Sequence, residues 1–345
     1  MMEVWGSVIA TYTFIASVAV GAYIVSMLST LFKLGGFKDI APLALRISWA
    51  SFIVLAIPLL LHLGSPWRAY KIFTSPNPTS PMAVAAWLVT LLVILTTILV
   101  VLDNWYRATR ASTIVTLGAI GVVLAVIYAG YPGVLFATAK GVEAWWHNQA
   151  LPITSILVSI LSGLSLTLLA YILLWRFSKM EVSKATLEYS VRVLLLLLLL
   201  VFILEISDII LRTYEAKTWI AEFNKALTGP LSISYVGLQL ILGSLIPLFL
   251  LALVLFRRVA VSAELMVIIV ILILIGSFTY KWNLLIGGEL VAMASTDVYT
   301  LGTYSIHFIE ILATLLSWLF LISLSLVIFA NWKVRVEKSG VEADV

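Results

Sequence analysis

Long apolar runs, each about the length of a membrane-crossing helix, recur along the whole chain of 345 residues. A hydrocarbon core about 30 Å thick is crossed by about 20 apolar residues in a helix. Hydrophobic residues make up 62% of the chain and charged residues 11%, whereas soluble domains average about 45–50% and about 25%. The sequence therefore predicts an all-α integral membrane protein.

Nine membrane spans are predicted, at residues 5–33, 42–65, 82–102, 112–131, 151–175, 188–212, 230–256, 262–281 and 304–330. Of the 21 Lys and Arg residues, fourteen fall on one side of this scheme and seven on the other. The richer side is predicted to be cytoplasmic, which places the N-terminus outside and the C-terminus inside the cell membrane. Four longer connections, at 66–81, 132–150, 213–229 and 282–303, then face outwards as a docking surface.

The residue inventory limits the cofactors that the chain can bind. The absence of cysteine excludes thiolate-ligated iron–sulfur clusters, covalently attached haem and disulfides within the chain. Only His62, His147 and His307 could ligate a haem, and His147 is predicted to lie in a loop, which disfavours haem. No metal-ligand spacing such as Glu-x-x-His occurs. The sequence pI of 9.2 does not indicate a nucleic-acid partner, because the basic residues cluster at span ends.

Ionisable side chains inside spans are costly and therefore informative. Glu205, Asp208 and Arg212 follow one another at i, i+3 and i+7 in the sixth span, which places them on one helical face. They could form a proton path or contribute to a quinone site, or Asp208 and Arg212 could simply neutralise each other. His307 and Glu310 in the ninth span allow the same two interpretations.

Aromatic and amide side chains gather on the predicted outer side. Most of the tryptophans are interpreted as an interfacial belt. A quinone headgroup at this depth needs an apolar channel and a few hydrogen-bonding groups for its carbonyls. Tyr12, His62 and Tyr131 would suit that task, and His62 could accept a proton when quinol is oxidised.

The connection between the second and third spans is the most polar stretch between two apolar runs. It contains prolines at 66, 76, 78 and 81, which forbid a continuous helix. We expect a structured loop in which Arg68 and Lys71 can reach lipid headgroups, a docked partner or a ligand.

Several motifs resemble the membrane subunits of the NrfD/polysulfide reductase family. The segments that carry the resemblance are His62-Leu-Gly-Ser-Pro-Trp-Arg68, Asn77-Pro-Thr-Ser-Pro-Met82 with Trp87, Tyr128-Ala-Gly-Tyr-Pro-Gly-Val-Leu-Phe-Ala137 and Leu151-Pro-Ile-Thr-Ser155. Weaker similarity continues at Tyr280-Lys-Trp282, at Ile286-Gly-Gly-Glu289 and at Glu310. In the family, Arg commonly replaces Lys281, Gln replaces Glu289, and an acidic residue usually stands where His62 does.

This resemblance implies a membrane anchor that binds a menaquinone-like quinone and carries no haem or iron–sulfur cluster of its own. It implies a pair of four-helix bundles, here extended by one C-terminal helix, with partners that are an iron–sulfur subunit and a molybdopterin-type catalytic subunit. Residues 1–175 are expected to form the N-terminal bundle and residues 176–345 the C-terminal bundle. The quinone site would comprise Tyr12, His62, Arg68 and Tyr131. The partner-docking segment would comprise Asn77, Pro78, Thr79, Ser80 and Pro81.

Two classes of function are therefore expected. The first is an anchor that is not catalytic alone and exchanges electrons between quinone and an extracytoplasmic iron–sulfur subunit. The second is a secondary transporter or proton channel. A transporter is expected to show broken helices in matching halves and a polar site at the midplane, and the sequence shows neither clearly. The carboxylates of the sixth span keep a proton-translocating role open within the redox interpretation.

Overall fold

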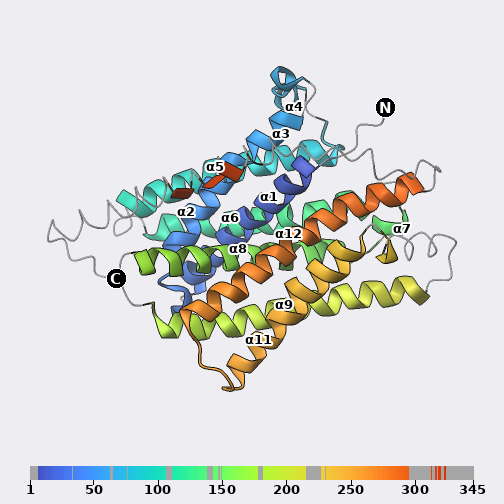
Figure 1. Cartoon of the computed structure of the whole chain (residues 1–345). Coiled ribbons are helices and arrows are strands. Elements are labelled where there is room, and N and C mark those ends of the chain that lie inside the picture. The colour runs from blue at the N-terminus through green and yellow to red at the C-terminus, as the bar shows by residue number, and fades with distance from the viewer. Residues whose placement is uncertain are drawn as a thin grey trace.

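The structure is a computed structural model that describes residues 7–32, 34–62, 65–75, 77–105, 111–137, 143–146, 148, 150–177, 182–214, 227–229, 231–294, 312, 315–316, 318–319 and 322–323. Every regular element within these residues is helical, as Figure 1 shows. The prediction of an all-α membrane protein is therefore confirmed.

The long helices are α1 (Ser7–Phe32), α2 (Ala41–Val54), α5 (Pro81–Trp105), α6 (Ala111–Ala137), α8 (Leu151–Phe177), α9 (Lys184–Tyr214), α11 (Ile246–Leu255) and α12 (Ala263–Ala294). The shorter helices are η1 (Gly35–Phe37), α3 (Ala56–His62), η2 (Pro66–Arg68), α4 (Lys71–Thr74) and α7 (Glu143–Trp146). A π-helix, η3 (Ser232–Leu245), runs directly into α11.

Eight helices of the described residues are long and apolar enough to cross a membrane, and they match the first eight predicted spans. The eighth span was predicted too short. Helix α12 continues to Ala294, so residues 282–294, which were predicted to begin a connection, are helical. The ninth predicted span lies largely outside the described residues, although its described positions, such as Trp318, are helical.

Helix α1 lies at the centre of the bundle and packs against α2, α6, α8 and α12. Its span is 83% buried, whereas that of α9 is 22% buried, so α9 is peripheral. Helix α8 also contacts α6, α9 and α12. It therefore joins the helices that precede it to those that follow it.

The close contact between α1 and α8 depends on glycine. A Cβ atom added at Gly21 would lie 1.7 Å from the carbonyl oxygen of Ser159, and one at Gly163 would lie 2.1 Å from the backbone nitrogen of Ala22. Small residues let membrane helices approach until their backbones touch. Gly21 and Gly163 thus allow α1 and α8 to pack in direct backbone contact.

The bundle end at which α1 begins and α6 ends also carries α7 (Figure 1), and we call it the α7 end. The opposite end contains a buried ion pair. Arg46 of α2 is 2% exposed, and its Nη2 lies 3.2 Å from Oδ2 of Asp103 in α5. The guanidinium also donates hydrogen bonds to the side-chain oxygen of Asn104 and to the carbonyl oxygen of Pro42. These bonds join α2 to α5.

Candidate functional site

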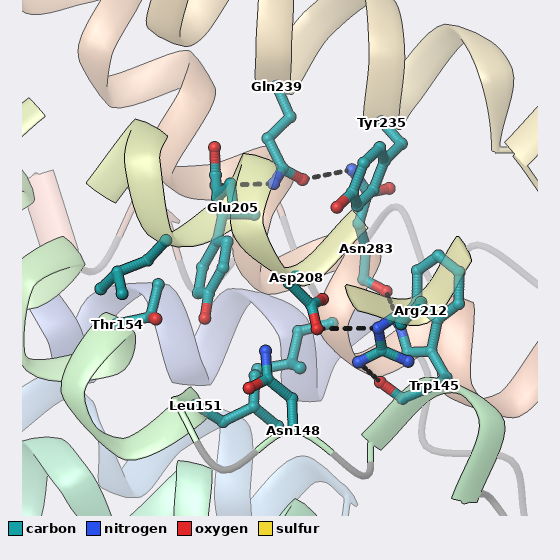
Figure 2. A pocket seen from close by; sticks show the side chains of 13 residues that line it. Trp145, Asn148, Leu151, Thr154, Glu205, Asp208, Arg212, Tyr235, Gln239 and Asn283 are labelled. Atoms are coloured by element: carbon teal, nitrogen blue, oxygen red, sulfur yellow. Dashed lines mark hydrogen bonds and ion pairs between the residues drawn. The ribbon is translucent and has the colours of Figure 1, made fainter. Parts of the chain in front are cut away.

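A polar cavity of about 40 Å³ lies near the α7 end, among α8, α9, η3 and α12. Figure 2 shows the side chains that line it. The lining consists of Trp145, Asn148, Leu151, Thr154, Leu204, Glu205, Asp208, Arg212, Tyr235, Gln239, Tyr280, Asn283 and Leu284. A buried water needs about 10–15 Å³, so this cavity has room for about three or four waters.

A chain of hydrogen bonds crosses the cavity from α12 to α9. Nδ2 of Asn283 donates to Oε1 of Gln239 at 2.8 Å, and Nε2 of Gln239 donates to Oε1 of Glu205 at 2.8 Å. An amide has one oxygen acceptor and one NH₂ donor, so the first bond fixes Gln239 as the donor to the carboxyl. The other carboxyl oxygen, Oε2 of Glu205, is buried and has no hydrogen-bond partner within the described residues.

The other two charged residues of α9 form an ion pair beside this chain. Nε of Arg212 lies 2.8 Å from Oδ1 of Asp208, and Nη2 of Arg212 donates to the carbonyl oxygen of Trp145 at 2.8 Å. The prediction that Glu205, Asp208 and Arg212 share one face is confirmed, because all three line the cavity. Asp208 and Arg212 neutralise each other, while Glu205 has no basic partner among the described side chains.

The α7 segment is bound to α12 through two buried tryptophans, of which Trp145 also lines the cavity. Nε1 of Trp145 donates to the carbonyl oxygen of Asn283, and Nε1 of Trp146 donates to that of Leu284. The two side chains are 5% and 7% exposed, so they belong to the protein interior. The interpretation of the tryptophans as an interfacial belt is therefore wrong for this pair.

The indole rings of Trp145 and Trp146 lie directly over Gly287 and Gly288. A Cβ atom at Gly287 would lie 2.4 Å from the ring of Trp145, and one at Gly288 would lie 2.2 Å from the ring of Trp146. Ring carbons of rigid side chains cannot yield that much space. The paired glycines, weakly informative as a sequence pattern, therefore leave the space on α12 that the two indole rings of the α7 segment occupy.

Replacing Gly287 with alanine should displace Trp145 and lower the free energy of unfolding by about 1–3 kcal/mol, the usual cost of overpacking. Thermal unfolding in detergent measures the change. Gly237→Ala is the matched control, because a Cβ atom there meets nothing within 4 Å, and it should unfold no more easily than the unmodified chain. Equal unfolding temperatures for the two variants would show that the packing of Trp145 does not require glycine at position 287.

The residues predicted to bind quinone lie elsewhere, at the α7 end of the first helices. The hydroxyl groups of Tyr12 in α1 and Tyr128 in α6 are 2.8 Å apart. Tyr131, one helical turn after Tyr128, is partly buried and lies within electrostatic reach of Tyr12. The structure thus brings Tyr12 and Tyr131 together and adds Tyr128, which was not assigned a role from the sequence.

The other two predicted quinone residues are not brought into this cluster by the described contacts. His62 is the last residue of α3, and its side chain lies outside the part that the structure describes. Arg68 is exposed in η2. Where side chains are described, no hydrogen bond joins Arg68 to the three tyrosines.

The predicted docking segment forms a tight turn before α5. Oδ1 of Asn77 accepts hydrogen bonds from the backbone nitrogen of Thr79 at 3.1 Å and from its hydroxyl at 2.7 Å. Pro81 is the first residue of α5, where its missing N–H costs nothing. The prolines at 66 and 81 do interrupt the helix, as expected, although η2 and α4 form between them. Residues 77–79 are exposed.

Two predicted residues, His307 and Glu310, lie outside the described residues. Sequence reasoning also missed several polar residues of the cavity, notably Gln239 and Asn283. Gln239 is an amide inside a predicted span and was not considered because only ionisable groups were. Asn283 was missed because the eighth span was predicted to end at residue 281, whereas α12 continues beyond it. Lys281 was taken as a span end, but it is 2% exposed within α12 and donates to Oγ of Ser155 at 2.9 Å.

Metal ligation has no candidate site in the described part of the chain. Within it, no group of three or more His, Cys, Asp or Glu side chains could hold a metal ion. The polar groups of the cavity are instead amides, hydroxyls, one carboxyl and one ion pair. Such groups bind water and exchange protons.

Comparison with known proteins identifies the family. The family model described as Polysulphide reductase, NrfD, matches residues 1–294. No curated protein matches the chain significantly. The family match covers most of the 345 residues and includes the motifs around Asn77, Tyr128 and Leu151 that suggested the resemblance. The chain therefore belongs to the polysulphide reductase family NrfD.

Proposed function

We propose that this protein is the quinone-binding membrane subunit of a respiratory oxidoreductase complex. In that role it exchanges electrons between a menaquinone-like quinone and an extracytoplasmic iron–sulfur subunit, which works with a molybdopterin-type catalytic subunit. The observation that carries the proposal is the hydrogen-bonded pair of tyrosines at the α7 end in a member of the NrfD family. The chain is not catalytic alone in this proposal.

The tyrosine cluster fits a quinone headgroup chemically. A quinone presents two carbonyl acceptors, and a phenolic hydroxyl can donate to either of them. Tyr12 and Tyr128 already share one hydrogen bond at 2.8 Å, in which either hydroxyl can be the donor, so a hydroxyl hydrogen can turn towards a ligand without losing a partner. Quinone supplies the electron-transfer chemistry when it is bound, and the tyrosines orient its headgroup.

The segment from η2 to the start of α5 is the proposed docking surface. It stands out from the neighbouring helices in Figure 1. Trp67 is 72% exposed and Tyr70 is 59% exposed, and Arg68 and Lys71 are exposed beside them. Exposed aromatic and arginine side chains are typical of residues that anchor protein interfaces. Residues 77–81 would hold this segment in place beside the iron–sulfur subunit.

The division of the chain and its orientation complete the proposal. Residues 1–175 would contain the quinone site and the docking surface, and residues 176–345 would form the second bundle. The excess of Lys and Arg on one side supports an extracytoplasmic α7 end and N-terminus, with the C-terminus inside. The docking surface and the tyrosine cluster would then face the same compartment as the partner.

Replacing Tyr131 with phenylalanine should weaken quinone binding by about 0.5–1.5 kcal/mol, the value of one neutral hydrogen bond. The dissociation constant would rise roughly twofold to thirteenfold, as measured by titrating the purified chain with a fluorescent quinone analogue. Tyr214→Phe, which changes a tyrosine that is 83% exposed, is the matched control. Equal affinities for all three proteins would remove Tyr131 from the site.

Purification with natural neighbours tests the function as a whole. Co-purifying quinone and iron–sulfur polypeptides would support the proposal. A lone chain that catalyses solute flux in liposomes would replace it with the transporter alternative.

A further inference from the structure

The cavity among α8, α9, η3 and α12 has a deeper neighbour. A second cavity of about 10 Å³ is lined by Glu205, Gly243, Ser244, Ser277 and Tyr280, among others. Glu205 and Tyr280 line both cavities. The second cavity has room for about one water. The carboxyl of Glu205 and the phenol of Tyr280 therefore lie between the two cavities.

Polar atoms without partners follow this route along one face of α12. Ser277, Tyr280 and Asn283 stand at i, i+3 and i+6 and are each less than a tenth exposed. The hydroxyl oxygens of Ser277 and Tyr280 and Oδ1 of Asn283 have no hydrogen-bond partner among the described atoms. At about 1.5 Å per residue they extend over about 9 Å. Buried polar groups are normally satisfied, so waters in the two cavities are the partners that fit.

We propose that Glu205 is a proton-loading site that exchanges its proton with solvent at the α7 end through the first cavity. A hydronium in the cavity gives up one proton, Oε2 of Glu205 takes it to form a neutral carboxylic acid, and a water remains. The reverse step restores the carboxylate. The hydrogen bond from Gln239 to Oε1 stays intact throughout, because the proton is gained and lost at the other oxygen.

Tyr280 would carry the proton onwards. Its hydroxyl can accept a proton from the first cavity and release its own to the second, so the phenol is unchanged after each transfer. The charged and titratable groups facing Glu205 are Asp208 and Arg212 on its own helix, Tyr235 of η3 and Tyr280 of α12. Lys281 faces Ser155 of α8 instead. Asp208 and Arg212 are paired, which leaves Glu205 as the carboxyl that can change its charge.

The inference deepens the proposed function, because quinol oxidation releases protons at the same end of the bundle. Its test is independent of quinone. The full-length chain in lipid membranes is titrated from about pH 5 to about pH 9 while infrared difference spectra record the C=O stretch of protonated carboxyl groups. We expect a band from a buried carboxylic acid that is lost in Glu205→Gln and kept in Glu264→Gln. Glu264 is the matched control, because its side chain is 70% exposed.

The second measurement tests the route of exchange. Thr154→Leu should fill the first cavity and slow hydrogen–deuterium exchange of the Glu205 band, because the waters that carry the proton need that space. Leu161→Met, a volume-conserving change at the second cavity, should leave the exchange rate unchanged. Gln239→Leu should shift the band frequency because Oε1 loses its donor, and it identifies the band independently if Glu205→Gln does not fold.

Three outcomes would overturn the proposal. They are a pH-dependent band that survives in Glu205→Gln, no pH-dependent buried band in the unmodified chain, and exchange slowed by Leu161→Met but not by Thr154→Leu. The result is separable from the quinone assignment, because Tyr131→Phe should leave the band unchanged. A titrating Glu205 in a chain that binds no quinone would refute the proposed function alone.

Discussion

Arg46→Met should lower the free energy of unfolding by about 3–5 kcal/mol, the cost of removing one partner of a buried ion pair. The guanidinium is 2% exposed and binds Asp103 together with the side chain of Asn104 and the carbonyl oxygen of Pro42. Methionine fills a similar volume but donates no hydrogen bond, so the carboxylate of Asp103 would lose the positive charge of Arg46 in a buried environment. Unfolding by detergent titration measures the change.

The chain contains a control for this substitution. Arg176 and Glu264 form an ion pair of 3.5 Å whose side chains are 76% and 70% exposed. Exposed pairs contribute little because solvent screens both charges, so Arg176→Met should leave the unfolding transition unchanged. If Arg46→Met and Arg176→Met have equal effects, burial does not determine the strength of the Arg46 pair.

The positions of the spans could be predicted because lipid imposes a simple rule on the sequence. Eight apolar runs correspond to eight helices in the described residues. The rule failed where a polar residue was buried by protein. Lys281 was read as the end of a span, but it lies inside α12 against Ser155, and the helix continues to Ala294. A charge at a lipid interface and a charge inside a helix bundle look alike in a sequence.

The candidate cavity was predicted in part for a similar reason. The helical period alone places Glu205, Asp208 and Arg212 on one face. Their partners Gln239 and Asn283 come from two other helices, and no local pattern reports which helices meet. The same limit applies to Gly287. It leaves space for the ring of Trp145, and that contact joins residues far apart in the chain.

The tyrosine cluster shows what a motif can and cannot supply. Tyr12 and Tyr131 were both selected for their depth and their hydroxyl groups, and the resemblance to the family implied the same two residues. The hydrogen bond between Tyr12 and Tyr128 requires α1 and α6 to pack together, which only the fold provides. The motif therefore pointed to residues of the proposed quinone site, and the packing of the helices shows which of them meet.

His62→Ala should slow quinol oxidation by about a hundredfold, the lower end of the range for losing a general base. His62 ends α3, just before the proposed docking surface, in the compartment where quinol would be oxidised. Oxidation releases two protons, and an imidazole with an ordinary pKa of about 6.5 can accept one near neutral pH. Assembly with the iron–sulfur subunit should be unchanged, as measured by co-purification.

His62→Glu separates a loss of the base from a loss of structure. The resemblance implies an acidic residue at this position in relatives, and a carboxylate can also accept a proton, so this variant should recover most of the rate. The rate of the unmodified complex should fall at acidic pH, because a protonated imidazole accepts no proton, whereas that of His62→Glu should persist to lower pH, because carboxyl groups ordinarily have a lower pKa than imidazoles. If both variants are equally slow, or if their pH profiles coincide with that of the unmodified complex, the proton acceptor is another group at the α7 end.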